Sequence, residues 1–320
     1  YGTHNFRAAA RNGKPDGTPS VWDVPGLEEY HGQDVFLTEA LAQEAVLALR
    51  DASDTGKPFF LNFCPYAVHV PIMANKRWLD HYPDLDPREA AYATMVESYD
   101  HALGALMTEL ERLDIAQNTL IVFASDNGGL SAHGRGGAPH VHNAPLKSGK
   151  GSAYEGGIRV PTMILWPGVA PSGLRVETPI SSPDLFATLL AAANAKPADL
   201  LETRDGRDLS PLLAREAAPF EDRMLGWHQP HQWGVKGPGI EPFTAIRQGD
   251  WKLIWFHADS RFELYNLAED LGETRNLAES QPNRLAHMID LMREWLDSRD
   301  AQMSIDKLTG QALPLPECGA

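Results

Sequence analysis

Cysteine is nearly absent from this chain of 320 residues, which contains only Cys64 and Cys318. Two cysteines so far apart exclude a disulfide framework and a cysteine-rich metal site. We expect one buried thiol and one thiol in a loose tail. Long apolar runs are also missing: none approaches the roughly 18 residues of a membrane-spanning helix. We therefore expect no membrane span.

Basic residues are outnumbered, with 28 Lys and Arg against 43 Asp and Glu and a formal net charge of −15. This balance argues against nucleic acid or an anionic membrane as a general partner. It does not exclude a small anion that a few local cations hold. The composition is otherwise that of a globular protein, with 43% hydrophobic and 22% charged residues.

Two common catalytic motifs are missing as well. There is no Gly-x-Ser-x-Gly, which excludes that type of hydrolase. The segment Gly149-Lys150-Gly151-Ser152 resembles a phosphate-binding loop, but Ala144 stands where that motif has its first glycine, and Gly151 follows the lysine instead of Ser or Thr. The segment is therefore not a nucleotide-binding loop.

The apolar periodicity predicts an α/β fold. We expect a mixed, mostly parallel sheet flanked by helices, incomplete at its N-terminal side, and a small C-terminal antiparallel sheet with a helix. The corresponding domains are residues 1–215 and 216–320. The expected helices are 35–49, 92–113, one starting at Ser182, and 285–296; the expected strands are 59–64, 120–124, 162–166, 223–228, 243–247, 251–256 and 262–265.

The stretch from Thr119 to Pro161 organises the chain. A short apolar run ends abruptly in Ser125-Asp126-Asn127-Gly128-Gly129. A carboxylate beside an amide oxygen suits a hard cation such as Ca²⁺ or Mg²⁺, although six or more oxygens are needed to complete a calcium shell. The same triplet is also a common turn without a metal, and from spacing alone the turn is the better interpretation.

Two further groups are placed to meet an anion. Lys150 lies among glycines that let a ligand approach, and a lysine is a point-charge donor to an oxyanion; the alternative is a solvated loop lysine. His69 follows the predicted strand 59–64, where ligands of α/β sheets often bind. A histidine that satisfies a loop backbone group explains the same position equally well.

Histidine and arginine gather in two other segments. The loop after Gly129 contains Arg135 and His140-Val141-His142, a pair that could form half of a zinc site but lacks a firm third ligand. The segment Trp227–Trp233, with His228 and His231, could line a sugar pocket or pack as a loop. We favour packing.

Together these segments resemble the arylsulfatase-type, formylglycine-dependent sulfatases of the alkaline phosphatase superfamily. The resemblance extends from about Val35 to Trp295. It rests on signatures in the family's order: AVHVP, SDNGG, LKSGKGSAYEGGIRVP, AIRQGDWKLIWF and ELYNLAEDLGETRNL.

The resemblance implies a sulfuric ester hydrolase that acts on a sulfated carbohydrate. Asp126 and Asn127 match two of the four protein ligands of the family's Ca²⁺, with Mg²⁺ as an alternative. Lys150 matches the lysine that contacts the sulfate and the leaving oxygen, and His69 matches the histidine that can protonate the leaving group. Additional candidates for substrate binding are Arg135, His140, His228 and His231. Relatives of this kind are often exported, which favours a periplasmic or secreted protein.

The family's nucleophile motif, Cys-x-Pro-x-Arg, is missing, because Cys64-Pro65-Tyr66-Ala67-Val68 does not fit it. We expect the formylglycine in a segment upstream of Tyr1, an inactive isolated chain, and possible self-association across the incomplete sheet. Two alternatives stay open. One is a truncated, non-catalytic protein that binds sulfated glycans, and the other is a phosphodiesterase or phosphonate hydrolase of the same superfamily.

Overall fold

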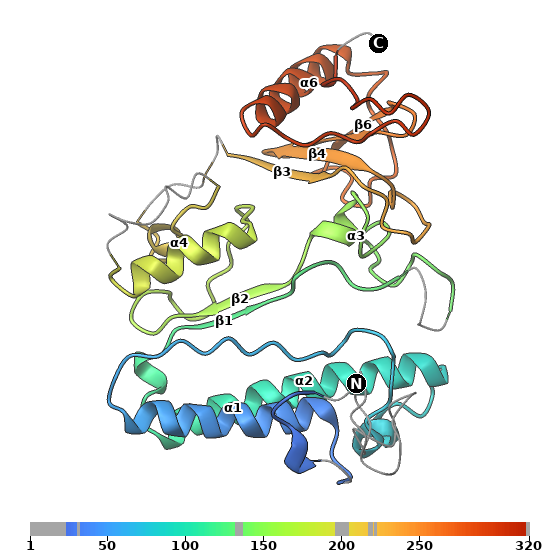
Figure 1. Ribbon diagram of the computed structural model, residues 1–320. Coiled ribbons are helices and arrows are strands. Elements are labelled where there is room, and N and C mark those ends of the chain that lie inside the picture. Colours follow the sequence, from blue (N-terminus) through green and yellow to red (C-terminus); the bar gives the residue numbers. More distant parts are fainter. Residues whose placement is uncertain are drawn as a thin grey trace. The chain divides into compact units, whose positions relative to one another are not determined.

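The computed structural model describes residues 24–30, 33–131, 137–195, 205–216, 220 and 223–317 (Figure 1). The chain divides into two compact units, each described by itself below. The first comprises Tyr1–Thr119 and His133–Gly137, and the second Leu120–Ala132 and Ala138–Ala320. The expected boundary at 215/216 lies inside the second unit and stays a prediction.

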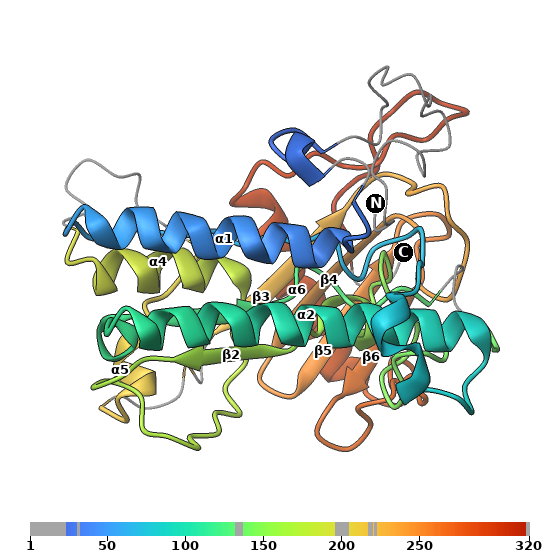
Figure 2. The same ribbon diagram turned by 90° about the horizontal axis from the view of Figure 1, so that it is seen from below.

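The first unit is built on two long helices, α1 (Leu37–Asp54) and α2 (Pro87–Arg112), which lie side by side in both views (Figures 1 and 2). Both predicted helices are confirmed. Glu109 of α2 accepts hydrogen bonds from Arg50 of α1 and from Arg112, at 2.7 Å and 2.6 Å. Three short 3-10 helices complete the unit: η1 (Glu28–Tyr30), η2 (Lys76–His81) and η3 (Ala116–Asn118).

The buried strand predicted for residues 59–64 is wrong. This segment forms no strand, and the side chains of Phe59, Phe60 and Leu61 are exposed, with Phe60 at 74%. Cys64 is exposed too, which corrects the expectation of a buried thiol. An apolar run becomes a strand only when a neighbouring strand satisfies its backbone groups, and none of the strands in the described residues pairs with this one.

In the second unit, β1 (Ile121–Ala124) pairs with β2 (Thr162–Leu165) in an antiparallel ladder, with Ile121 opposite Leu165. We expected a mixed, mostly parallel sheet, and this pair is antiparallel. Parallel neighbours need a long crossover, usually a helix. Among its described residues, the connection from 125 to 161 carries one short helix, α3 (Glu155–Ile158).

Two helices follow β2. They are α4 (Ser182–Ala192) and the short α5 (Ser210–Leu213). Helix α4 starts at Ser182, as we expected, and Ser181 is its N-cap, whose backbone N–H donates to the Asp184 carboxylate at 2.7 Å. The mixed α/β class with helices around the strands is confirmed.

The C-terminal sheet has the order β3-β4-β5-β6 and is antiparallel throughout, as predicted. Its strands are β3 (Met224–Gln229), β4 (Phe243–Gln248), β5 (Trp251–Phe256) and β6 (Phe262–Asn266). Helix α6 (Pro282–Asp297) covers one face through Met288, Ile289, Met292 and Leu296 (Figure 1). The other face meets Ala153 and Tyr154, so it packs on the glycine-rich segment that contains Lys150.

No helix in the described part of the chain is long and apolar enough to cross a membrane.

Candidate active site

The glycine-rich segments at 126–129 and 149–157 pack backbone against backbone. The N–H of Gly128 donates to the carbonyl of Gly157 at 2.9 Å, and the N–H of Lys150 donates to that of Gly129 at 3.1 Å. A Cβ added to Gly128 would lie 1.8 Å from the carbonyl oxygen of Gly156. Only glycine permits this approach, which joins the segment of Asp126 to the segment of Lys150.

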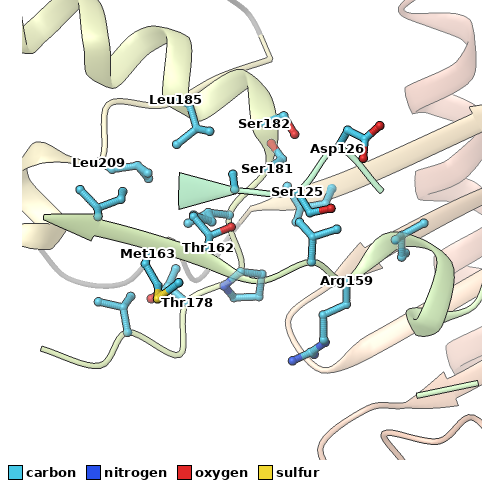
Figure 3. A pocket seen from close by; sticks show the side chains of 18 of the residues that line it. Ser125, Asp126, Arg159, Thr162, Met163, Thr178, Ser181, Ser182, Leu185 and Leu209 are labelled. Carbon is cyan, nitrogen blue, oxygen red and sulfur yellow. The ribbon is translucent and has the colours of Figure 1, made fainter. Parts of the chain in front are cut away.

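Asp126 and Asn127 lie directly after β1 and line one pocket of the second unit (Figure 3). Asp126 is exposed, and its Oδ1 accepts the N–H of Asn127 at 2.8 Å. The amide nitrogen of Asn127 donates to the carbonyl of Gly128 at 2.9 Å, which orients its Oδ1 away from that backbone. The backbone bends at these two residues, and the bend leaves a carboxylate oxygen and an amide oxygen available for a cation.

These two oxygens fit the donor chemistry of calcium, but they cannot fill its shell, which takes six to eight oxygens. Among the described residues, no group of three or more His, Cys, Asp or Glu side chains is placed to hold a metal ion. Asp126 and Asn127 would therefore supply part of a calcium site. The calcium and magnesium expectations stay predictions.

The pocket has a volume of about 900 Å³ and also contains Lys150, Arg159 and Arg247. The sequence interpretation assigned no role to either arginine, although both lie in signatures that carry the family resemblance. Arg159 is partly held by Glu155, with Nε and Oε2 2.7 Å apart. Burial lowers the pKa of Arg247, against the opposing effect of Glu155. Because both arginines lie close to Glu155, Lys150 is the cation of this pocket that is best placed to meet an anionic ligand.

Lys150 and Lys147 lie three residues apart and have different surroundings. The ammonium of Lys147 donates to the carbonyl of Glu273 at 3.0 Å and lies 3.7 Å from the ring centre of Tyr154. The ammonium of Lys150 lies 5.9 Å from the ring centre of Trp233 and faces the pocket. Lys147 is therefore part of the packing, whereas Lys150 is placed to meet a ligand.

A buried ionic cluster holds the glycine-rich segment at 149–157 in place. Lys252 is fully buried, and its ammonium lies 2.9 Å from Oε1 of Glu155 and 2.8 Å from Oε1 of Glu273. Glu273 also accepts the backbone N–H of Glu155 at 2.6 Å. Because Glu155 directly precedes Gly156 and Gly157, the cluster determines where Gly128 and the residues before it can lie.

The two carboxylates of this cluster respond differently to their surroundings. Burial alone would raise the pKa of Glu155, but Lys252 and Arg159 lower it overall. Burial raises the pKa of Glu273, and the single neighbouring lysine does not fully offset that effect. The sequence did signal the cluster, since Lys252 occupies a core position between the aromatic residues of β5, but the pairing was not foreseen.

His69 belongs to the first unit. Its Nδ1 lies 2.8 Å from the carbonyl of Val70. A carbonyl only accepts, so Nδ1 carries the hydrogen and Nε2 of the exposed ring is left to accept or deliver a proton. This tautomer agrees with the role that the resemblance implies, and that role stays a prediction.

His228 lines the pocket, but protein groups occupy both of its nitrogens: Thr244 at Nδ1 and the carbonyl of Gln302 at Nε2, each at 2.9 Å. The hydrogen-bond network continues from Thr244 to His257 and from His257 to Ser304. The hydroxyl of Ser304 donates to the carbonyl of Pro230. Because burial and His228 lower the pKa of His257 to about 4, His257 is neutral.

The directions of these hydrogen bonds follow from the carbonyl ends. Ser304 donates to a carbonyl, so it accepts from Nδ1 of His257, and Nε2 of His257 then accepts from Thr244. Thr244 must accept from Nδ1 of His228, whose Nε2 also donates to a carbonyl. The place of His228 in this network favours a structural role, and substrate binding by this residue stays a prediction.

The remaining candidates are less directly placed. His140 has a positive φ of 65° and its ring packs against Gly237, since a Cβ there would lie 2.3 Å from Cε1. His231 is exposed, and neither residue lines the pocket. Arg135 lies outside the described residues.

Comparison with protein-family models agrees with this arrangement. The model described as "Sulfatase" matches residues 4–195, more than half of the chain. The chain belongs to the sulfatase family. A second model, "N-sulphoglucosamine sulphohydrolase, C-terminal", matches residues 149–302, which include the glycine-rich segment and the C-terminal sheet.

Individual relatives agree with the family models. A "Sulfatase" of Formosa agariphila is 33% identical over 309 residues, covering 89% of this chain and 55% of the relative. The N-acetylgalactosamine-6-sulfatase of Canis lupus familiaris is 35% identical over 181 residues, covering 55% of this chain and 32% of its own length. The chain thus spans between about a third and just over half of these two relatives.

A solved structure, "Crystal structure of Ps i-CgsB in complex with k-i-k-neocarrahexaose", is 29% identical with a TM-score of 0.74 and covers 97% of this chain and 68% of that one. The fold therefore extends over nearly the whole sequence.

Proposed function

We propose that this chain supplies part of the active site of a sulfuric ester hydrolase that acts on a sulfated carbohydrate. The observation that carries the proposal is the shared pocket of Asp126, Asn127 and Lys150 in a chain of the sulfatase family. Oxygen ligands and a lysine on adjoining glycine-rich segments form a place where a metal-bound sulfate ester can be held.

In this proposal each residue has a distinct task. Asp126 and Asn127 contribute oxygens to a calcium ion, which when bound would neutralise charge on the sulfate oxygens. Lys150 donates to the sulfate and to the leaving oxygen of the ester. His69, which belongs to the first unit, keeps the proton-donor role that the family resemblance implies. The nucleophile is expected upstream of Tyr1, because this chain contains no Cys-x-Pro-x-Arg.

The names of one relative and of one related structure support a carbohydrate substrate. One relative is named an N-acetylgalactosamine-6-sulfatase, and one related structure contains neocarrahexaose. Both are statements about those proteins. The pocket of about 900 Å³ is large enough for sugar units as well as the sulfate group. We further propose an exported protein, periplasmic or secreted, as the family resemblance implies.

The decisive experiment compares this chain with the same chain extended by the residues encoded before Tyr1. Both are assayed with 4-nitrophenyl sulfate and with a sulfated oligosaccharide in the presence of calcium. We expect turnover from the extended protein alone, and a loss of about 100-fold in kcat after Lys150→Ala or Asp126→Ala. Lys307→Ala, which changes an exposed lysine, is the matched control and should leave kcat unchanged.

Turnover by the chain alone would contradict an upstream nucleophile. Binding of sulfated oligosaccharide without turnover by either form would instead support a non-catalytic sulfated-glycan binder. Faster cleavage of 4-nitrophenyl phosphate esters than of the sulfate ester would favour the phosphodiesterase alternative.

A further inference from the structure

Trp233 lies next to Lys150 and is held there by the backbone. Gly151 has a φ of +84°, and a Cβ added to it would lie 2.4 Å from Cε3 of Trp233 and 2.7 Å from Cζ3. The benzene edge of the indole therefore rests directly on the peptide that follows Lys150. Any other residue at position 151 would be strained and would displace the ring.

The loop that carries Trp233 is attached to the lysine segment at two further points. Ser152 Oγ donates to the carbonyl of Pro238 at 3.0 Å, and the N–H of Ala153 donates to the carbonyl of Gly239 at 3.1 Å. The two segments thus form one unit, and the indole keeps its position relative to Lys150 without a ligand. An aromatic ring fixed in advance loses little conformational entropy when a ligand binds.

Trp233 is only partly buried and lines the same pocket as Lys150, Asp126 and Asn127. An indole in a hydrophobic core would be expected to bury both faces, but this one leaves surface to the pocket. The ammonium of Lys150 lies 5.9 Å from the ring centre, at the outer limit of a cation–π contact. Lys150 is therefore close to the ring, and its ammonium can still bind a ligand.

We propose that Trp233 is the aromatic wall of a sugar subsite, on which a pyranose ring of the sulfated ligand stacks while its sulfate group meets Lys150. The inference rests on the proposed function and adds a specificity-determining residue to it. A pyranose ring has an apolar C–H face that matches an aromatic surface, and polar edges that carry the sulfate. Trp233 would therefore select a flat sugar ring beside the charged group, and Lys150 the anion.

This assignment changes the interpretation of the Trp227–Trp233 segment. Trp227 lies in β3, packs against the core cluster of the C-terminal sheet and also lines the pocket. Trp233 rests on a glycine of the lysine loop and lines the pocket beside Lys150. The two tryptophans thus differ in what holds them, and only Trp233 is attached to the segment of Lys150.

The test measures binding by this chain, in the presence of calcium, to inorganic sulfate, to neocarrahexaose and to the desulfated hexaose. Trp233→Ala should weaken binding of the sulfated hexaose about tenfold and leave inorganic sulfate within about twofold. Trp233→Phe should retain most of the sugar affinity, because a ring remains. Trp251→Phe, which changes a tryptophan that packs under Arg284 outside the pocket, should behave as wild type.

A second measurement reports on the indole itself. Sugar stacking should change the tryptophan emission of the wild-type protein, and this change should disappear in Trp233→Phe but persist in Trp251→Phe. Equal weakening of sulfate and hexaose by Trp233→Ala would overturn the proposal, because the residue would then act on the lysine loop alone.

The outcomes separate this inference from the proposed function. If inorganic sulfate binds but the hexaose binds no more tightly, the sugar subsite is wrong and the anion site stands. If neither binds and Lys150→Ala changes nothing, both are wrong.

Discussion

Two sets of charged groups meet at the glycine-rich segment around Lys150 and have opposite surroundings. Lys147, Glu155, Lys252 and Glu273 are paired with one another or with backbone carbonyls, in an interior where an unpaired charge is costly. Asp126 and Lys150 have few protein partners and line an open pocket. The pairing in the first set fixes the backbone that presents the second set.

The buried cluster gives the largest expected effect. Lys252→Met removes the only lysine between Glu155 and Glu273 and leaves two buried carboxylates facing each other. We expect a loss of about 3–5 kcal/mol in the free energy of unfolding, measured by urea denaturation. Lys307→Met, at an exposed position, should cost less than about 0.5 kcal/mol. A Lys252→Met protein as stable as wild type would show that the cluster does not hold the segment.

The two neighbouring lysines sharpen the comparison. Lys147→Met loses a charged hydrogen bond and a cation–π contact with Tyr154, so the free energy of unfolding should fall by about 2–3 kcal/mol. Lys150→Met loses neither and should stay within about 0.5 kcal/mol of wild type. In sulfate binding the order is reversed: Lys150→Met should abolish binding, and Lys147→Met should not. Similar effects of both substitutions on stability would remove the distinction between them.

How far the sequence predicted this arrangement depends on the range of each interaction. The helices α1, α2 and α6 and the hairpin β4-β5 were predictable, because their signals lie within a few neighbouring residues. The pairing of β1 with β2 and the exposure of Phe60 were not, since both depend on which segment is available as a partner. The hydrophobicity of a strand indicates that it must pair with another strand, but it does not identify which one.

The site follows the same rule. Asp126, Asn127 and Lys150 were found from their local motifs and do share a pocket. Arg247 and Trp233 come from the C-terminal part of the chain and enter the pocket by tertiary packing. The sequence left a sugar pocket and a packed loop open for the segment of Trp233, and assigned no role to Arg247. Lys252 had a signal, a lysine between core residues of a strand, but its partners could be recognised only in three dimensions.

The hydrogen-bond network around His257 offers a further test, because burial acts there on a titratable group. The native pKa of His257 is lowered to about 4, mainly by burial, whereas the unfolded value is about 6.5. Between these values the unfolded chain binds the additional proton, so acid favours unfolding and stability falls as the pH drops from about 6.5 to about 4. We expect this group to contribute about 2 kcal/mol to that loss, less than the full shift implies because the site is not completely enclosed.

The measurement is urea denaturation between pH 4 and pH 7. His257→Gln should be less stable at pH 7 but show a weaker pH dependence than wild type. His287→Gln, which removes an exposed histidine of α6, should keep the wild-type dependence. An unchanged pH dependence in His257→Gln would mean that His257 does not stay neutral in the native state.

The smallest expected effect concerns the open set of charges. If Asp126 and Asn127 supply part of a calcium shell, calcium should stabilise this chain weakly, since most ligands are not assigned. With a dissociation constant near 1 mM, 5 mM calcium would add about 1 kcal/mol to the free energy of unfolding. Asp126→Asn should abolish this gain, whereas Asp84→Asn, at an exposed position of the first unit, should retain it. Calorimetric titration with calcium and with magnesium checks the same point directly. If calcium still stabilises the Asp126→Asn protein, the cation does not bind at the end of β1. The open pocket would then be an anion site alone.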